Sequence, residues 1–224
     1  MQRLPAPIRR MVDRVQSRAS IHERILYWAY GPQFRNWCDS NPCECAVDRW
    51  ELYRSLVERE GLDGPIDYLE FGVAAGASIR WWVENSPHWE STFVGFDSFA
   101  GLPEDWLNRP RGSFSTNGES PAITDPRCSF VKGLIQDTLP EWLTGREFRR
   151  RTVLHIDVDL YSSTLVVLTQ LLPKLKVSDI IIFDEFGVEL HEYRAFVDAT
   201  TAYPLRFAPL YRTANFDRVA LKVI

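Results

Sequence analysis

The stretch from Ile66 to Ser78, IDYLEFGVAAGAS, decides the fold. A short apolar run leads into two glycines, Gly72 and Gly76, and a helix is expected directly after them over residues 77–85. This order is typical of a strand-turn-helix unit in a parallel sheet, whose strands are buried on both faces. Gly72 permits a tight turn, and Gly76 lets the backbone approach a ligand at the helix N-terminus. The glycine spacing alone fits a plain strand-to-helix turn equally well.

The rest of the chain repeats this alternation of strand and helix. Five more apolar runs follow: STFVGFD (91–97), CSFVKG (128–133), RTVLHIDVD (151–159), DIIIFDEF (179–186) and ALKVI (220–224). Helices are expected between them over 136–148, 162–174 and 189–202. The alternation predicts a doubly wound α/β sheet that is mostly parallel.

The N-terminal part of the chain has a different character. Residues 21–60 carry helical spacing, and residues 1–20 hold five arginines against one aspartate. We expect a helical cap or dimer segment over 1–60, followed by a single domain over 61–224, since 224 residues suit one α/β core. For residues 1–20 a surface or dimer-contact helix is favoured over an organelle transit peptide or a membrane-surface helix.

The net charge and the hydropathy of the chain limit the kinds of partner that it is expected to bind. Lysine and arginine number 26 and acidic residues 30, so the net charge of -4 disfavours a nucleic-acid binder. No apolar run is long enough to span a bilayer, and no secretory signal is present. The spacing of Cys38, Cys43 and Cys45 fits no common zinc pattern, so free thiols are expected. These features predict a cytoplasmic protein with a small-molecule or protein partner.

Residues 98–127 interrupt the alternation. This stretch has four prolines and little periodicity, and an irregular insert of that length in a compact domain is usually functional. It follows a strand directly, and ligands of open α/β sheets bind beyond the carboxyl ends of the strands. We therefore expect a lid over the site, with Trp106, Phe114 and Asn117 as candidates for contact with a sugar ring.

Asp97 stands at the tip of the second expected strand, 21 residues beyond Gly76. An acidic residue at this distance from a glycine turn is how such folds bind the hydroxyls of a ribose. The turn lacks the G-x-G-x-x-G spacing of dinucleotide enzymes. The combination favours an adenosyl ligand without a pyrophosphate over NAD.

Four carboxylates follow the next two strands: Asp157 and Asp159 in HIDVDLYSST, and Asp184 and Glu185 in IIIFDEF. Carboxylates that converge at adjacent strand ends repel one another, and a cation is the natural compensation. Oxygen ligands favour Mg²⁺, with Mn²⁺ or Ca²⁺ as alternatives, over zinc. Solvation or pairing with arginine is the competing interpretation. His155 lies inside a strand, where an interior histidine with satisfied hydrogen bonds is favoured over a ligand.

Five separated blocks of this sequence resemble the macrocin O-methyltransferase family of metal-dependent sugar methyltransferases. The blocks are YLEFGVAAGAS, FVGFDSFAGLPEDW, FVKGLIQDTLP, LHIDVDLYSST and IIIFDEFG, and the resemblance covers roughly residues 43–197. It implies a class I methyltransferase (Rossmann-like) fold with a seven-stranded sheet, whose closing antiparallel hairpin PLRFAPLY and RVALKVI would supply. It also implies transfer of a methyl group from S-adenosylmethionine to a hydroxyl, most simply of a sugar or glycoside.

The resemblance also implies roles for individual residues. Asp157 would be the general base between cofactor and acceptor, and Mg²⁺ would be held by Asp159, Asp184 and Glu185. Binding of S-adenosylmethionine would involve Glu70, Phe71, Gly72, Val73, Gly76, Asp97, Ser98, Phe99, Gly101, Gln136, Asp137 and Asp157. By the same resemblance, Glu70, Gly72 and Gly76 would lie on the turn that holds the methionine portion of the cofactor.

The sequence departs from the family pattern at two places and leaves other functions open. Glu185 stands where the family commonly has a second aspartate, and Cys43-Glu44-Cys45 replaces a Thr-Met segment that closes on the cofactor. A metal-dependent glycosyltransferase that uses the D-x-D motif is one alternative, and a non-catalytic cofactor-binding scaffold is another. Within methyl transfer, a catechol-type acceptor is a further alternative, because Mg²⁺ chelates aromatic and sugar diols alike.

Overall fold

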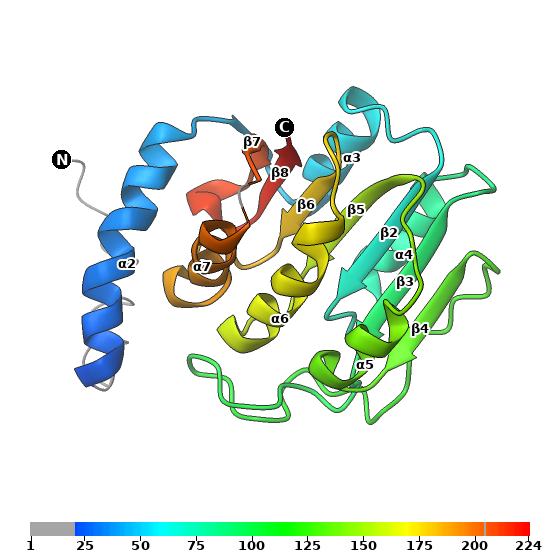
Figure 1. The fold of residues 1–224 in the computed structure, drawn as a ribbon. Coiled ribbons are helices and arrows are strands. Elements are labelled where there is room, and N and C mark those ends of the chain that lie inside the picture. The colour runs from blue at the N-terminus through cyan, green and yellow to red at the C-terminus, as the bar shows by residue number, and fades with distance from the viewer. Residues whose placement is uncertain (1–20, 204) are drawn as a thin grey trace.

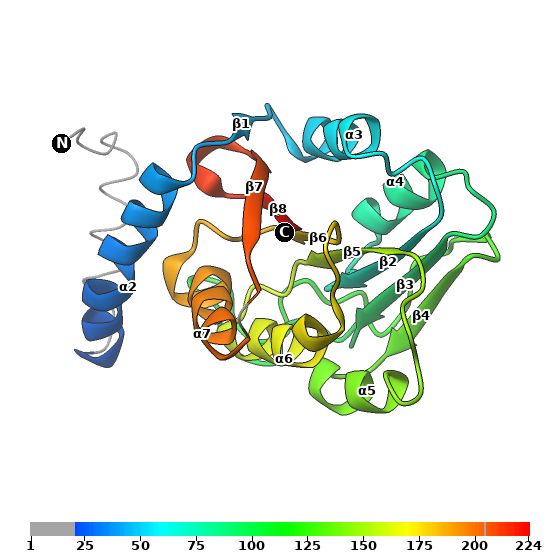
Figure 2. The same cartoon turned by 45° about the horizontal axis from the view of Figure 1, so that its top comes forward.

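The protein is built as a twisted sheet between two layers of helices (Figures 1 and 2). The computed structural model describes residues 21–203 and 205–224, so the helix expected within residues 1–20 lies outside the described part. The strands are β1 (Glu44–Cys45), β2 (Ile66–Phe71), β3 (Thr92–Asp97), β4 (Cys128–Lys132), β5 (Arg151–Ile156), β6 (Ile180–Phe183), β7 (Phe207–Arg212) and β8 (Val219–Val223). The helices are α2 (Ile21–Ser40), α3 (Arg49–Arg59), α4 (Ala77–Asn85), α5 (Ile135–Trp142), α6 (Tyr161–Leu171) and α7 (Arg194–Ala202).

The sheet has the order β1-β7-β8-β6-β5-β2-β3-β4. Strands β4, β3, β2, β5 and β6 run parallel, whereas β8 pairs antiparallel with both β6 and β7. The doubly wound, mostly parallel sheet and its closing hairpin are therefore confirmed. Because β2 is flanked by β3 on one side and β5 on the other, the chain reverses its winding direction there, and a crevice opens beyond the carboxyl ends of these strands.

The sheet has eight strands rather than the seven expected. The additional strand, β1, pairs with β7 at the edge through Glu44 and Cys45, within the stretch expected to be helical. Two residues carry no periodicity of their own, and the strand exists only because β7 offers it an unpaired edge. The expected helical stretch 21–60 is thus two helices, α2 and α3, separated by this strand.

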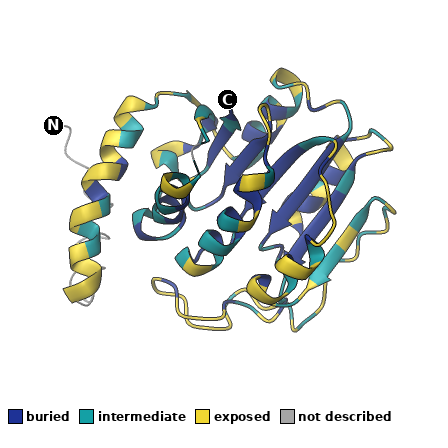
Figure 3. Ribbon diagram, viewed as in Figure 1, coloured by how far each residue is buried: buried dark blue, intermediate teal, exposed yellow. Residues whose placement is uncertain are grey.

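The central strands β2, β5 and β6 are buried on both faces, as their apolar runs predicted (Figure 3). Alternate residues of β2 point to opposite sides: Leu69 and Phe71 pack among α5, α6 and α7, and Ile66 and Tyr68 pack among α3 and α4. Figure 2 shows these two helical layers on either side of the sheet, with α2 beside α7. Helix α2 adds Phe34 to the first of these clusters.

The boundaries of two helices differ from the expected ranges. Helix α5 ends at Trp142 rather than near residue 148, and α7 is preceded by a π-helical turn, Glu189–Tyr193. Single π turns of this kind are frequent at functional sites. Residues 98–127 contain no helix and no named strand, which confirms the long irregular insert. Among the described residues, no helix is long and apolar enough to cross a membrane.

Gly72 is needed for the packing of two strand ends against each other. Its φ is +85°, and a Cβ at this position would stand 1.7 Å from the carbonyl oxygen of Asp157. Its amide donates to the Phe96 carbonyl at 2.9 Å, so the turn is also fixed to β3. Gly72 therefore closes the end of β2 between β3 and β5.

A pair of glycine variants separates this contact from the left-handed backbone itself. Gly61 has a φ of +66° and no atom within 4 Å of an added Cβ. We expect Gly61→Ala to lower the free energy of unfolding by about 1–2 kcal/mol, the cost of a left-handed residue. Gly72→Ala should cost about 1–3 kcal/mol more, because of overpacking. Urea unfolding of both variants measures the difference; equal losses would contradict the contact.

Candidate active site

One pocket lies beyond the carboxyl ends of β2, β3, β5 and β6, where the sheet topology opens a crevice. Its volume is about 450 Å³, within the usual range for small-molecule sites. It is lined by Arg49, Gly72, Ala74, Phe96, Asp97, Ser98, Gly101, Leu102, Pro103, Trp106, Arg109, Phe114, Gly133, Leu134, Ile135, Gln136, Asp157, Val158, Asp159, Ser163, Asp184 and Glu185. The irregular insert supplies one wall, in keeping with its expected place over the site.

The pocket brings together the residues expected to hold metal with half of those expected to hold cofactor. The four carboxylates Asp157, Asp159, Asp184 and Glu185 all line it. Of the other expected cofactor residues, Gly72, Asp97, Ser98, Gly101 and Gln136 line it as well, whereas Glu70, Phe71, Val73, Gly76, Phe99 and Asp137 do not.

Asp97 holds the two turns that border the pocket. Its Oδ2 accepts hydrogen bonds from the amides of Val73 and Ala74, both at 2.8 Å, and its Oδ1 accepts from the amide of Phe99 at 2.7 Å. The carboxylate thus fastens the glycine turn after β2 to the start of the insert after β3. A carboxylate offers about four acceptor positions, so three backbone bonds leave capacity for one more donor from a ligand.

Gly76 accommodates the insert rather than opening directly on the pocket. Its φ is +78°, and an added Cβ would meet the ring of Pro121 at 2.5 Å. The sequence predicts that the backbone approaches a ligand at Gly76, whereas the neighbour found at this position is a proline of the insert. Gly76 keeps the N-terminus of α4 narrow enough for the insert to cross it.

Three carboxylates on the pocket wall have free oxygens. The side chains of Asp157, Asp159 and Glu185 form no hydrogen bond or ion pair with any described residue. Burial and the nearby charge of Asp184 raise the pKa of Asp159 to about 6 and, with Asp217 and Asp159 adding to the effect, that of Glu185 to about 8. The same two causes raise the pKa of Asp157. Mutual repulsion of this kind is relieved when a cation binds.

Asp159 has a further unusual feature. Its φ is +60°, a left-handed conformation that costs a residue with a side chain about 1–2 kcal/mol. Such strain tends to persist where it serves a function. Here it follows β5 and accompanies a carboxylate that faces the pocket.

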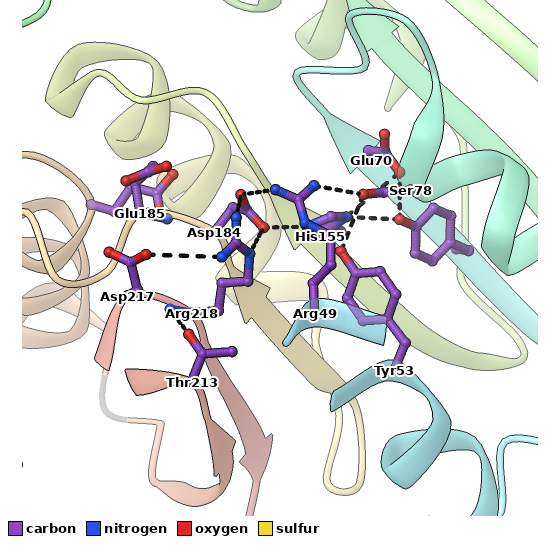
Figure 4. A network of polar contacts seen from close by, with 12 residues as sticks. Arg49, Tyr53, Glu70, Ser78, His155, Asp184, Glu185, Thr213, Asp217 and Arg218 are labelled. Atoms are coloured by element: carbon purple, nitrogen blue, oxygen red, sulfur yellow. Dashed lines mark hydrogen bonds and ion pairs between the residues drawn. The ribbon is translucent and has the colours of Figure 1, made fainter. Parts of the chain in front are cut away.

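Asp184 differs from the other three because two arginines neutralise it (Figure 4). Arg218 donates to both of its oxygens, through Nε to Oδ1 at 2.7 Å and through Nη2 to Oδ2 at 2.9 Å. Arg49 donates to the same Oδ2 at 3.1 Å. Although burial acts to raise the pKa of Asp184, His155, Arg218 and Arg49 together lower it to about 2. This carboxylate is 2% exposed and remains ionised.

His155 lies beneath the pocket in a buried hydrogen-bonded chain (Figure 4). Its Nδ1 contacts the hydroxyl of Tyr68 at 2.8 Å, and that hydroxyl donates to Glu70; its Nε2 contacts the hydroxyl of Tyr53 at 3.3 Å. Burial acts to lower the pKa of His155, but Asp184 and Glu70 outweigh it and raise it to about 9. His155 could group with Asp157 and Asp184 around an ion by distance alone. A protonated imidazole has no free lone pair, so His155 acts here as a buried charge partner.

Glu192 holds the backbone of the acidic pair. It comes from the π-helical turn, is fully buried, and its Oε2 accepts a hydrogen bond from the amide of Glu185 at 2.9 Å. Its Oε1 has no hydrogen-bond partner in the described chain. From the sequence Glu192 looks like an ordinary polar residue of a surface helix, and only its burial shows otherwise.

The insert supplies an apolar wall opposite the carboxylates. Leu102, Trp106 and Phe114 line the pocket, and the guanidinium of Arg109 stacks over the Phe114 ring at 5.4 Å. Of the three residues proposed from the sequence as sugar contacts, Trp106 and Phe114 are on the wall, and Asn117 is not. This wall gives the pocket an aromatic surface beside its acidic one.

Residues 104–203, which contain all four pocket carboxylates of the β5 and β6 ends, match the family model described as macrocin O-methyltransferase (TylF). Over these residues the chain is similar to the macrocin O-methyltransferases. Two curated proteins are similar to it over a longer stretch. An 8-demethyl-8-(2,3-dimethoxy-α-L-rhamnosyl)-tetracenomycin-C 4′-O-methyltransferase of Streptomyces olivaceus is 29% identical over 71% of this chain and 70% of its own. A demethyldecarbamoylnovobiocin O-methyltransferase of Streptomyces niveus is 28% identical over 73% and 72%.

Solved structures of methyltransferases share the fold of this chain. The O-methyltransferase NovP superposes with a TM-score of 0.59 at 24% identity and 78% coverage of both chains. The calicheamicin methyltransferase CalS11 superposes with a TM-score of 0.56 at 21% identity, covering 99% of this chain and 94% of its own. The class I methyltransferase fold expected from the sequence is therefore confirmed, and O-methyl transfer is the class of activity that the family match supports.

The hydrogen bond from the amide of Glu185 to the side chain of Glu192 can be tested directly. We expect Glu192→Met to speed hydrogen exchange of the Glu185 amide by about tenfold or more, because a buried donor loses its acceptor. Glu192→Gln keeps an acceptor oxygen and should keep the protection. Exchange of segment 183–188 followed by mass spectrometry reads the effect. Unchanged exchange in Glu192→Met would show that the bond does not hold the turn.

Proposed function

We propose that this protein is an S-adenosylmethionine- and Mg²⁺-dependent O-methyltransferase that acts on a sugar hydroxyl of a glycosylated natural product or polysaccharide precursor. The observation that carries the proposal is the shared pocket. Carboxylates with free oxygens, at Asp157, Asp159 and Glu185, line the same cavity as Gly72 and Asp97 of the expected cofactor side. The methyl donor and the acceptor hydroxyl of a methyl transfer would therefore be bound in the same pocket.

The carboxylates fit a divalent cation by the chemistry of their donor atoms. Oxygen ligands from carboxylates suit Mg²⁺, and the set includes no neutral histidine or thiolate that would favour zinc. We assign Asp159, Asp184 and Glu185 as the residues that would hold the ion. When bound, the ion would lower the pKa of an acceptor hydroxyl and orient it.

The cofactor side of the pocket fits an adenosyl ligand. We assign the ribose hydroxyls to Asp97, whose carboxylate keeps one acceptor position, and the adenine to the segment around Gln136 after β4. Glu70 lies below the pocket and is bonded to Tyr68, so its part in cofactor binding is to support the turn from beneath. A cluster of carboxylates also suits a cofactor that carries a sulfonium charge.

Asp157 is our candidate for the general base. It follows β5 between the cofactor and acceptor sides and lines the pocket, and neither of its carboxylate oxygens accepts a hydrogen bond from a residue that the structure describes. An alcohol must lose its proton as it attacks the methyl group, and a carboxylate within hydrogen-bond reach takes that proton. S-Adenosylmethionine supplies the methyl group and leaves as S-adenosylhomocysteine.

A sugar acceptor is supported by the curated relatives and by the pocket wall. One relative is named for methylation of a rhamnosyl 4′-hydroxyl, and the family is named for a glycosylated antibiotic precursor. Leu102, Trp106 and Phe114 provide an apolar surface on which a sugar ring can lie, with the carboxylates facing its hydroxyls. A catechol could use the same wall, so the two acceptor classes are compared in the test below.

Methyltransferase assays with purified protein test the proposal. With S-adenosylmethionine, Mg²⁺ and a panel of glycosides, sugar nucleotides and catechols, we expect transfer to a sugar hydroxyl. Asp157→Asn should lower kcat by about 10²- to 10⁴-fold, the usual contribution of a general base. Binding of S-adenosylhomocysteine, measured by calorimetry, should persist in this variant. Asp63→Asn, an exposed acid outside the pocket, is the matched control and should keep full activity.

Removal of metal gives an independent measurement. Dialysis against EDTA should abolish turnover, and added Mg²⁺ or Mn²⁺ should restore it. Full turnover after chelation would contradict the metal assignment. Binding of a UDP-sugar without any binding of S-adenosylhomocysteine would favour a glycosyltransferase. Cofactor binding with no turnover on any acceptor would favour a scaffold.

A further inference from the structure

Arg49 reaches from the N-terminal segment into the pocket, and the proposed reaction does not yet use it. It is the first residue of α3, whose start is fixed by the Asp48 side chain accepting from the amide of Glu51. Its side chain is 27% exposed and lines the pocket. One guanidinium nitrogen, Nη1, donates to Ser78 Oγ at 3.4 Å, and the other, Nη2, donates to Asp184 Oδ2 at 3.1 Å (Figure 4).

These two partners belong to the two halves of the site. Ser78 is in the first turn of α4, directly after the glycine turn expected to hold the methionine portion of the cofactor, and is 3% exposed. Asp184 is in the carboxylate set expected to hold the metal. Arg49 is thus a single charge that bridges the cofactor side and the metal side.

The charges of the residues that line the pocket explain why a positive charge at Arg49 is useful for binding the cofactor. Five acids line the pocket: Asp97, Asp157, Asp159, Asp184 and Glu185. Only two bases line it among the described residues, Arg49 and Arg109. S-Adenosylmethionine carries a carboxylate on its methionine portion, and that group would be repelled by the acids unless a cation met it. Arg109 is in the exposed insert over Phe114, whereas Arg49 is beside Ser78 and the glycine turn.

We propose that Arg49 binds the methionine carboxylate of the cofactor and, in doing so, releases Asp184 for the metal. The inference rests on the function proposed above. In this structure Nη2 of Arg49 donates to Asp184. A ligand carboxylate beside Ser78 would compete with Asp184 for this nitrogen. Asp184 does not lose its charge balance when Arg49 turns away, because Arg218 still donates to both of its oxygens.

The consequence is a coupling between two binding events. Cofactor binding removes one donor from Asp184 Oδ2 and so leaves that oxygen with a free acceptor position toward the pocket. A divalent cation then meets one more available ligand oxygen. By linkage, the cofactor raises the affinity for metal and the metal raises the affinity for cofactor by the same factor.

Arg49 also enters the pocket from a part of the chain where the sequence departs from the family pattern. The resemblance places Cys43-Glu44-Cys45 where a Thr-Met segment would close on the cofactor. Glu44 and Cys45 form β1 at the edge of the sheet, paired with β7, and none of the three residues lines the pocket. The segment that follows β1 instead sends Arg49 to the cofactor side.

Binding of two adenosine thioethers distinguishes a contact with the carboxylate from general support of the fold. S-Adenosylhomocysteine carries the methionine carboxylate, and 5′-methylthioadenosine lacks it. We expect Arg49→Met to weaken binding of S-adenosylhomocysteine by about ten- to a hundredfold, the loss of a charge-assisted hydrogen bond, and to leave binding of 5′-methylthioadenosine unchanged. Arg80→Met removes an equal charge from the exposed side of α4 outside the pocket, so both affinities should stay the same.

Calorimetric titration with Mn²⁺ alone, without acceptor, tests the coupling. Saturation of the wild type with S-adenosylhomocysteine should tighten Mn²⁺ binding by about tenfold, within the usual range of such couplings, whereas 5′-methylthioadenosine should not. Arg49→Met should bind Mn²⁺ without any ligand as tightly as the wild type does with S-adenosylhomocysteine.

The outcomes separate this inference from the proposed function. Equal weakening of both adenosyl ligands in Arg49→Met would overturn the carboxylate contact, and an Mn²⁺ affinity independent of S-adenosylhomocysteine would overturn the coupling. Wild-type protein that binds no S-adenosylhomocysteine at all would overturn the proposed function itself. Unchanged binding of 5′-methylthioadenosine also shows that the variant is folded.

Discussion

The rest of the structure depends on one buried negative charge, Asp184. An ionised carboxylate that is removed from water needs partners of opposite charge, and leaving it without any costs about 3–5 kcal/mol. Asp184 has such partners from three separate parts of the chain: Arg49 from α3, His155 from β5 and Arg218 from the connection between β7 and β8. The N-terminal segment, the parallel sheet and the closing hairpin are therefore locked together at the same point where the active pocket begins.

The other carboxylates of the pocket differ in the hydrogen bonds that they accept from the protein, and their roles differ accordingly. The carboxylate of Asp97 accepts three hydrogen bonds from backbone amides, and these bonds fix the shape of the cofactor side of the pocket. Asp157, Asp159 and Glu185 accept no hydrogen bond through their side chains from residues 21–203 or 205–224, and their oxygens are available to a ligand. A fold whose acids were all paired would be more stable and less reactive. The strained backbone at Asp159 and the repulsion around Glu185 are the cost of keeping these oxygens available.

The sequence predicts the parts of this molecule that depend on local pattern. The runs at β2, β3, β5 and β6 are recognisable because strands buried on both faces must be apolar throughout, and the acids at their ends stand out against that background. Strand β1 could not be predicted, because two residues pair only through the tertiary edge of β7. Arg49 and Arg218 lie 135 and 34 residues from Asp184, and each looks locally like a solvated arginine. The sequence predicts that the backbone at Gly76 approaches a ligand, and sequence spacing could not reveal that Pro121 lies against this glycine.

Because Gly76 and Pro121 are in contact, the sequence of the insert and the sequence of the core cannot change independently. Pro121 lies against the start of α4 where only a glycine leaves room, and Lys132 of β4 donates to the Gly118 carbonyl. The segment is thus fitted to two core elements at its far end, whereas Trp106 and Phe114, nearer to its start, line the pocket. Acceptor preference can then diverge among related enzymes by point changes in the near half, while exchange of the whole segment as a cassette requires matched changes in the core beneath it.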